Sequence, residues 1–139
     1  MERMKTINLL VAILCLTFIV TACGRKMNFI NSSIVPGATG QVDVKKDRNS
    51  NYVINVNVLN LAEPKRLSPP KEVYVVWMEA SNESAKKLGQ ITPSSGLLSK
   101  ALRATMSATV ITEPKRVFIT AEDNIDVSYP GGQTVLTTQ

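Results

Sequence analysis

The chain has 139 residues, of which 44% are hydrophobic and only 5% aromatic, and its formal net charge is +5. It contains no histidine, which removes the commonest general base and the commonest neutral metal ligand. A chain of this length is long enough for one domain with an ordinary hydrophobic core.

The first 22 residues have the composition of a signal peptide. Arg3 and Lys5 outweigh Glu2 at the start, and the stretch from Leu9 to Val20 is almost wholly apolar. As a helix this stretch would be about 18 Å long, which is short of the ~30 Å hydrocarbon core of a bilayer. The pattern predicts a cleaved signal peptide over residues 1–22 rather than a spanning helix, with an uncleaved anchor as the alternative.

The signal peptide ends in Val20-Thr21-Ala22-Cys23, which resembles a bacterial lipobox. Processing at such a site cuts before the cysteine and acylates it, so Cys23 is the predicted lipidation site, carrying fatty acids such as palmitate. One acyl chain anchors a protein weakly, whereas two or more anchor it firmly. We therefore expect a protein tied to a membrane of the bacterial cell envelope, on the extracytoplasmic side. Gly24, the residue after the cysteine, is compatible with sorting to the inner or to the outer membrane.

The charge limits the classes of partner that we expect, and the cysteine content limits the disulfides that the domain can form. Two basic residues and one acidic residue leave with the leader, so the net charge falls from +5 to +4. No aromatic residues interleave with the remaining basic pairs, so we expect solvated loop charges and no nucleic-acid partner. Cys15 is lost with the leader and Cys23 is acylated, which leaves no disulfide to stabilise the domain.

The region after the cysteine divides into a tether and the start of a folded domain. Residues 23–40 are small and polar and contain a Pro-Gly turn, so they are predicted to be a tether whose Ile34 and Val35 dock at its end. From residue 41 the pattern becomes an alternation of apolar and polar residues. It is interrupted by a turn at residues 47–51, so residues 41–60 are predicted to form a β-hairpin.

The next strongly apolar stretch is residues 73–78. It follows a proline-rich connection at residues 61–70, and it is apolar on both faces, as in a central strand. Trp77, Tyr74 and Val75 are the residues we expect to anchor the core.

Further strands are predicted at residues 88–91, 108–111, 117–121 and 134–138. Residues 97–106 fit either a helix or a strand. About seven short strands separated by Pro, Gly and Asn turns predict an all-β, Ig-like antiparallel β-sandwich over residues 41–139.

Residues 40–139 resemble the extracytoplasmic C-terminal domain of anti-sigma-K factors. The resemblance is carried by the proline-led strand at residues 69–77 that ends in Tyr-x-x-Trp, by Leu-Gly-Gln-Ile at 88–91, and by residues 118–122 and 129–136. Asp123 and Gln133 stand where that family usually has proline. The family's anti-sigma activity lies in a cytoplasmic N-terminal domain, and here only a leader precedes Cys23. The resemblance therefore implies the sensory half alone, with a place in envelope signalling or in the regulation of sigma-factor activity.

No nucleophile elbow or phosphate-binding glycine loop occurs in the sequence, and its serines have no histidine to activate them. Glu122, Asp123 and Asp126 gather near one strand end and would bind Ca²⁺ weakly, or form a solvated acidic turn. We predict a non-enzymatic module without cofactor or metal that binds another envelope protein. The alternatives are a module for an envelope glycan or peptide and a hydrolase. The residues of the binding surface cannot be predicted from the sequence.

Overall fold

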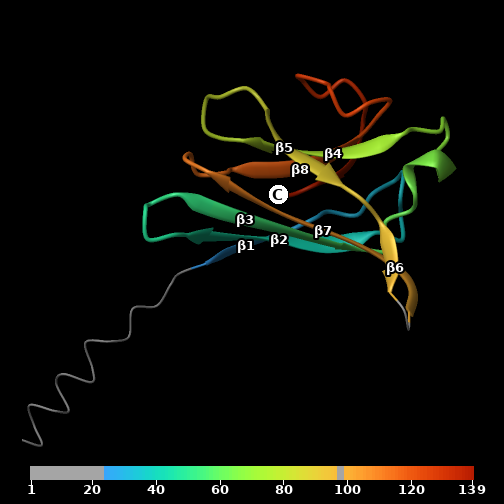
Figure 1. The fold of residues 1–139 in the computed structure, drawn as a ribbon, viewed down its shortest axis with the longest axis horizontal. Coiled ribbons are helices and arrows are strands. Elements are labelled where there is room, and N and C mark those ends of the chain that lie inside the picture. The colour runs from blue at the N-terminus through green and yellow to red at the C-terminus, as the bar shows by residue number, and fades with distance from the viewer. Residues whose placement is uncertain (1–23, 97–98) are drawn as a thin grey trace, which may run out of the picture.

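The computed structural model describes residues 24–96 and 99–139. The predicted signal peptide and Cys23 lie outside the described residues. Nine strands form two antiparallel sheets in the described part of the chain (Figure 1). The five-stranded sheet contains, in spatial order, β1 (Arg25–Asn28), β2 (Thr39–Lys46), β3 (Tyr52–Leu59), β7 (Ser99–Val110) and β6 (Ser94–Gly96).

The second sheet has four strands and packs against the first. Its spatial order is β5 (Lys86–Ile91), β4 (Val73–Glu79), β8 (Arg116–Glu122) and β9 (Gln133–Thr137). Strands β2-β3-β7-β6 follow the A-B-E-D order of an immunoglobulin-like sheet, and β4-β8-β9 follow C-F-G with β5 added beside β4. The predicted all-β, Ig-like antiparallel sandwich is confirmed, with nine strands in the described residues where about seven were predicted.

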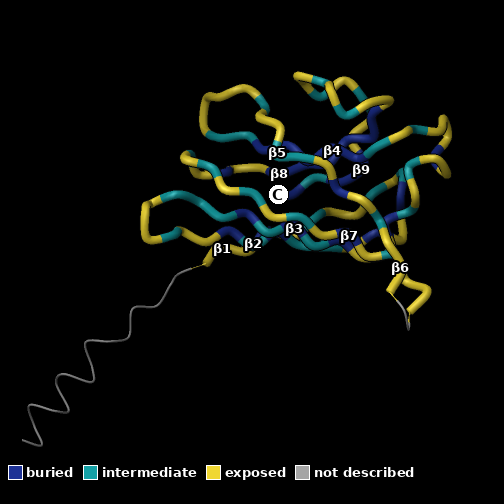
Figure 2. Tube along the Cα trace, viewed as in Figure 1, coloured by how far each residue is buried: buried dark blue, intermediate teal, exposed yellow. Residues whose placement is uncertain are grey.

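The alternation of apolar and polar residues in the sequence explains which side chains fill the space between the sheets. In β3, Ile54, Val56 and Val58 are buried, whereas the residues between them are half-exposed. Tyr74 and Val76 of β4 belong to the same cluster of buried residues. Dark-blue buried segments accordingly line the interior of the sandwich in Figure 2. The hairpin predicted at residues 41–60 is confirmed, with Val42 paired to Val56.

The turn of this hairpin is closed by one carboxylate. Asp47 accepts hydrogen bonds from the backbone N–H of Asn49 at 2.8 Å and of Asn51 at 2.9 Å. The bond from the Asn51 backbone is the main cause of a lowered pKa for Asp47. Because the folded state favours the ionised form, this stabilisation is present above the unfolded pKa and is lost as the pH falls.

Strand β4 is apolar on both faces because both faces are covered. Val75 and Trp77 point away from the main core and form a second buried cluster with Phe118. Ile125 and Val127, from the loop between β8 and β9, pack against this cluster. The prediction that Trp77, Tyr74 and Val75 are core residues is confirmed, but they belong to two clusters on opposite faces of one sheet.

The ambiguous stretch at residues 97–106 is a strand from residue 99 onward, while Leu97 and Leu98 lie outside the described residues. β7 pairs antiparallel with β3 from Arg103 to Val110, and Ala104 is buried between the sheets. Lys100 lies before this pairing begins and is exposed, so its charge does not oppose strand formation.

The prediction that residues 23–40 form a tether is wrong for the described part of that range. β1 pairs antiparallel with β2, and Met27, opposite Val42, is 4% exposed. The predicted docking of Ile34 and Val35 is confirmed, because Val35 is buried and Ile34 packs against the core, and Ala38 is also buried. The small, polar composition indicated flexibility, but main-chain pairing along a sheet edge needs only one inward apolar side chain in a strand of four residues.

No helix in the described ranges has both the length and the apolar character needed to span a membrane.

Gly132 provides a test of how tightly the second sheet is packed. A Cβ at this position would overlap the carbonyl oxygen of Ala121 and lie 2.8 Å from Oε2 of Glu122. We expect Gly132→Ala to lower the free energy of unfolding by about 1–3 kcal/mol, measured by urea denaturation.

Gly131→Ala is the matched control. A Cβ at Gly131 meets no atom closer than 3.9 Å, so this variant should stay within about 0.5 kcal/mol of wild type. Equal destabilisation by both variants would contradict the tight approach at Gly132.

Candidate functional site at the loop end of the sandwich

The sandwich has two ends with different connections. One end, which we call the Gly24 end, contains Gly24 and the short connections 47–51, 80–85 and 111–115. The other, which we call the loop end, contains the long connections 29–38, 60–72 and 123–132 and the start of β7. The Gly24 end lies at the left of Figure 1 and the loop end at the right, with connection 123–132 turning back over the second sheet at the top. In immunoglobulin-like folds the loops cluster at the two ends of the sandwich, and in variable domains the loops of one end bind the ligand.

Two of the long connections are joined to each other. The ammonium of Lys71 lies 3.0 and 2.9 Å from the two carboxylate oxygens of Asp123. The backbone N–H of Glu72 donates to the carbonyl oxygen of Glu122 at 3.0 Å. The Asp123 side chain is 79% exposed, so solvent screens the ion pair and its contribution to stability is small. Its effect is to fix connection 60–72 against connection 123–132.

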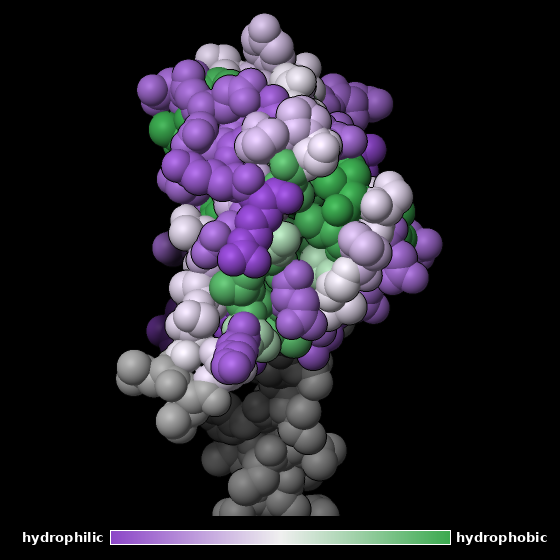
Figure 3. Space-filling model, turned by 90° about the vertical axis from the view of Figure 1, so that its right-hand side faces the viewer, coloured by the Kyte–Doolittle hydropathy of each residue, from purple (hydrophilic) through white to green (hydrophobic). Residues whose placement is uncertain are grey.

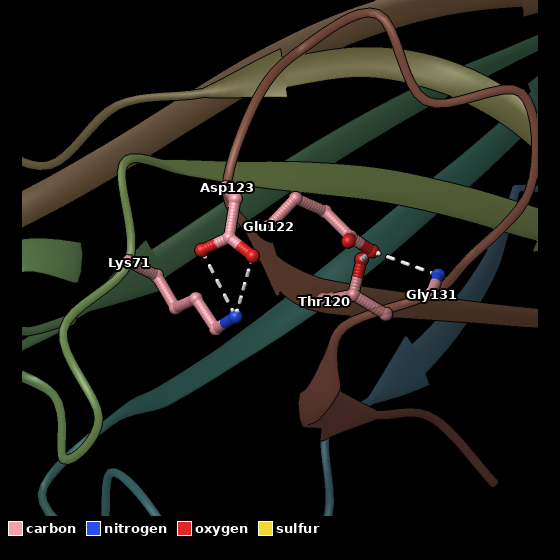
Figure 4. Close-up of polar contacts among 5 residues, drawn as sticks. All are labelled: Lys71, Thr120, Glu122, Asp123 and Gly131. Carbon is pink, nitrogen blue, oxygen red and sulfur yellow. Dashed lines mark hydrogen bonds and ion pairs between the residues drawn. The ribbon is translucent and has the colours of Figure 1, made fainter.

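A buried carboxylate lies beneath this joint (Figure 4). Glu122 is only 4% exposed. Its Oε1 accepts hydrogen bonds from the hydroxyl of Thr120 at 2.6 Å and from the backbone N–H of Gly131 at 3.2 Å. The Thr120 oxygen in turn accepts from Nε1 of Trp77 at 2.8 Å. This chain connects the indole of the second core cluster to the backbone of the covering loop.

The opposite side of the covering loop is fixed by a lysine. Nζ of Lys87 donates to the carbonyl oxygens of Ile125 and Val127, at 2.9 and 3.0 Å. Together with the Glu122 bonds, these contacts keep connection 123–132 over Trp77. The buried polar groups of this region therefore maintain a loop conformation, and the carboxylate of Glu122 is engaged in structural hydrogen bonds.

The three acidic residues that lie close together in the sequence have different environments in the structure. Glu122 is buried, Asp123 pairs with Lys71, and the backbone of Asp126 bonds to the side chain of Asn124. The described residues contain no group of three His, Cys, Asp or Glu side chains that could hold a metal ion. The alternative of a solvated acidic turn is wrong for Glu122, because Thr120 and Gly131 replace water as its partners.

The surface of the loop end has an apolar patch. Leu59, at the end of β3, is 37% exposed on the outer face of the five-stranded sheet, and Ile34 and Ala62 are half-buried and pack against the main core. Figure 3 looks onto this end and shows green apolar side chains between purple hydrophilic ones. Beneath the patch, the hydroxyl of Tyr74 donates to the carbonyl oxygen of Ala62 at 2.8 Å. Burial raises the pKa of Tyr74 to about 12, so this hydroxyl keeps its proton at neutral pH.

A polar groove crosses the outer face of the five-stranded sheet near the same end. It consists of a hollow of about 700 Å³ and a neighbouring hollow of about 290 Å³, which share Leu59 and Arg103, and we call it the Arg103 groove. Its other lining residues are Asn28, Gly40, Gln41, Asn57, Thr92, Ser94, Ser95, Gly96, Ser99, Ala101 and Thr105. Oδ1 of Asn57 is buried and has no hydrogen-bond partner among the described residues.

No pattern in the sequence indicates this groove. Asn57 and Arg103 lie 46 positions apart, and they come together only because β3 pairs with β7. Comparison of the chain with family models, curated proteins and solved structures finds no match. The resemblance to the anti-sigma-K domain stays a prediction.

The chain from Trp77 to Glu122 can be tested at its central hydroxyl. Thr120→Val keeps the shape of the side chain but leaves the Trp77 N–H without its acceptor, and it leaves the buried carboxylate with only the hydrogen bond from Gly131. We expect the free energy of unfolding to fall by about 1–3 kcal/mol and the tryptophan fluorescence to change, because the indole loses its acceptor.

The same substitution on an exposed site serves as the control. Thr134 lies on β9 and is exposed, so Thr134→Val should change stability by less than about 0.5 kcal/mol. A Thr120→Val protein as stable as Thr134→Val, with unchanged fluorescence, would show that the hydroxyl has no structural role.

Proposed function

We propose that the protein is a lipid-anchored recognition domain of the bacterial cell envelope, which binds another envelope protein through its loop end. The observation that carries this proposal is the position of β1. This strand begins at Arg25 and pairs with β2, so only Gly24 separates it from Cys23. A lipidated Cys23 would place the Gly24 end against the bilayer, and the loop end would point away from it.

The geometry of the chain keeps the predicted lipid attachment site close to the first strand of the sandwich. Consecutive Cα atoms are 3.8 Å apart, so Cys23 lies within about 8 Å of Arg25 whatever conformation it takes. A fully processed bacterial lipoprotein bears several acyl chains, which keep it on the membrane. The domain is therefore held at the surface as a body, and its exposed far end is the part available to other envelope components.

The chemistry of the loop end suits a protein partner. Apolar side chains, with Leu59 the most exposed of those named above, lie between hydrophilic ones (Figure 3). Protein interfaces have this arrangement, with a desolvated apolar centre and a polar rim. With the sequence resemblance to the anti-sigma-K C-terminal domain, it supports a receiving role in envelope signalling or in the regulation of sigma-factor activity. The role is non-enzymatic, and it uses neither cofactor nor metal.

A second candidate function is the binding of an envelope glycan or peptide in the Arg103 groove. It is favoured by the unpartnered Oδ1 of Asn57, which a hydroxyl or amide of such a ligand would satisfy. The groove is rich in hydroxyl and amide side chains and contains one guanidinium. These groups bind polar polymers by hydrogen bonds.

Lipidation is tested by labelling cells with a radioactive fatty acid. Wild type and Cys15→Ala should incorporate label, because Cys15 lies within the predicted leader. Cys23→Ala should incorporate none, because it lacks the acylated thiol. Equal incorporation in the wild type and in Cys23→Ala would contradict the anchor.

The binding surface is tested by pulldown from detergent-solubilised membranes. Wild type should recover one stoichiometric protein, and Leu59→Glu should lower its recovery about tenfold or more, as for a central interface residue. Ser107→Glu, at an exposed position in the middle of β7 and outside the loop end, should leave recovery unchanged. Recovery of bait alone, with saturable glycan binding that Arg103→Ala abolishes, would overturn the protein-binding function in favour of the second candidate.

A further inference from the structure

The end of β2 and connection 111–115 lie beside the chain that leads to Cys23. β1 pairs Arg25 with Val44, and its guanidinium lies 3.7 Å from Glu113 in connection 111–115. A Cβ on Gly24 would lie 3.3 Å from the Cγ of Lys45. Residues from connections 47–51 and 111–115 therefore also contact whatever surface holds Cys23.

The charges of this end are predominantly positive. Four carboxylates lie there, and each is already engaged: Asp47 by its own turn, Glu79 by Arg116, Glu83 by Lys86 at the start of β5, and Glu113 by Arg25 and Lys115. The exposed basic residues are Arg25, Lys45, Lys46, Arg48, Lys86, Lys115 and Arg116. Of these, Lys45, Lys46 and Arg48 form no ion pair within the described part of the chain.

One large apolar side chain stands among these charges. Ile111 follows β7 directly and is 80% exposed, more than Leu59, Ile30 or Tyr129. An isolated exposed apolar residue is ordinary on a protein surface. Here its position is informative, because it is two residues from Glu113, which contacts Arg25 beside the predicted lipid attachment.

We propose that the Gly24 end is a second membrane-contact surface, in which Ile111 inserts into the bilayer and Lys45, Lys46 and Arg48 bind anionic lipid headgroups. The inference rests on the proposed lipidation of Cys23. The bilayer is the occupant because a single residue, Gly24, separates Cys23 from β1, which leaves no room for a protein between this end and the membrane. Basic residues beside an apolar side chain match the charged headgroup layer and the hydrocarbon beneath it.

This contact has a consequence for orientation. Lipid chains alone would leave the sandwich free to rotate about its attachment. Contacts from two further loops would fix the sandwich upright and keep the loop end directed away from the membrane, toward its partner.

The test uses the lipidated protein reconstituted in vesicles of phosphatidylcholine with one-fifth phosphatidylglycerol. A Cys15→Ala background carries either Ile111→Cys or Tyr129→Cys, each labelled with an environment-sensitive fluorophore. Tyr129 is the control, because it is 73% exposed but belongs to connection 123–132 of the loop end. Lipids with a quencher in the acyl chain should quench the probe at position 111 at least about threefold more than the probe at position 129, since shallowly inserted groups lie at the acyl boundary.

The basic residues are tested by their dependence on anionic lipid. Changing Lys45, Lys46 and Arg48 together to glutamine should reduce the quenching at position 111 to its value in pure phosphatidylcholine vesicles. A Lys65→Gln/Arg66→Gln variant, altered at the loop end, should behave like the parent protein.

The outcomes separate this inference from the proposed function. Equal quenching at both positions in a protein that carries fatty acid on Cys23 would overturn the membrane contact and leave the anchor intact. Shielding of the probe at position 111 only after addition of envelope extract would assign this surface to a protein and also overturn the inference. A reconstituted protein without fatty acid on Cys23 would overturn the proposed function and the inference together.

Discussion

Main-chain pairing between β1 and β2 is the constraint that determines how close the sandwich lies to Cys23. It continues the five-stranded sheet to Arg25, and it buries Met27 opposite Val42. It also means that no flexible tether separates the sandwich from Cys23. A lipid on Cys23 would consequently act on the whole sandwich, and the two ends of the fold would acquire different environments.

The two ends are built differently. At the Gly24 end the connections are short and carry exposed basic residues with Ile111. At the loop end they are long, and polar contacts hold them in place: the bonds of the buried Glu122 carboxylate and the Lys71–Asp123 ion pair. A buried carboxylate is costly unless its hydrogen bonds are satisfied, so its use here indicates that the conformation of connection 123–132 is specified rather than left to packing alone.

The sequence predicted the parts of the fold that depend on local pattern. The alternation in residues 41–60 predicted the hairpin, and the doubly apolar stretch at 73–78 predicted the central strand. It did not predict β1, because an edge strand with one inward side chain has no periodic signal. Nor did it predict the Arg103 groove, which arises from the long-range pairing of β3 with β7, or the burial of Glu122, which depends on the covering loop that brings the N–H of Gly131 to its carboxylate.

In the proposed function, the folded domain starts immediately after a lipid-bearing Cys23, which holds it at an extracytoplasmic membrane surface. Intact mass spectrometry of the protein extracted from the membrane fraction tests this placement. We expect a chain that begins at Cys23, with a mass increased by acyl groups on that residue. A chain that still begins at Met1, without acyl groups and recovered from the soluble cytosolic fraction, would contradict it.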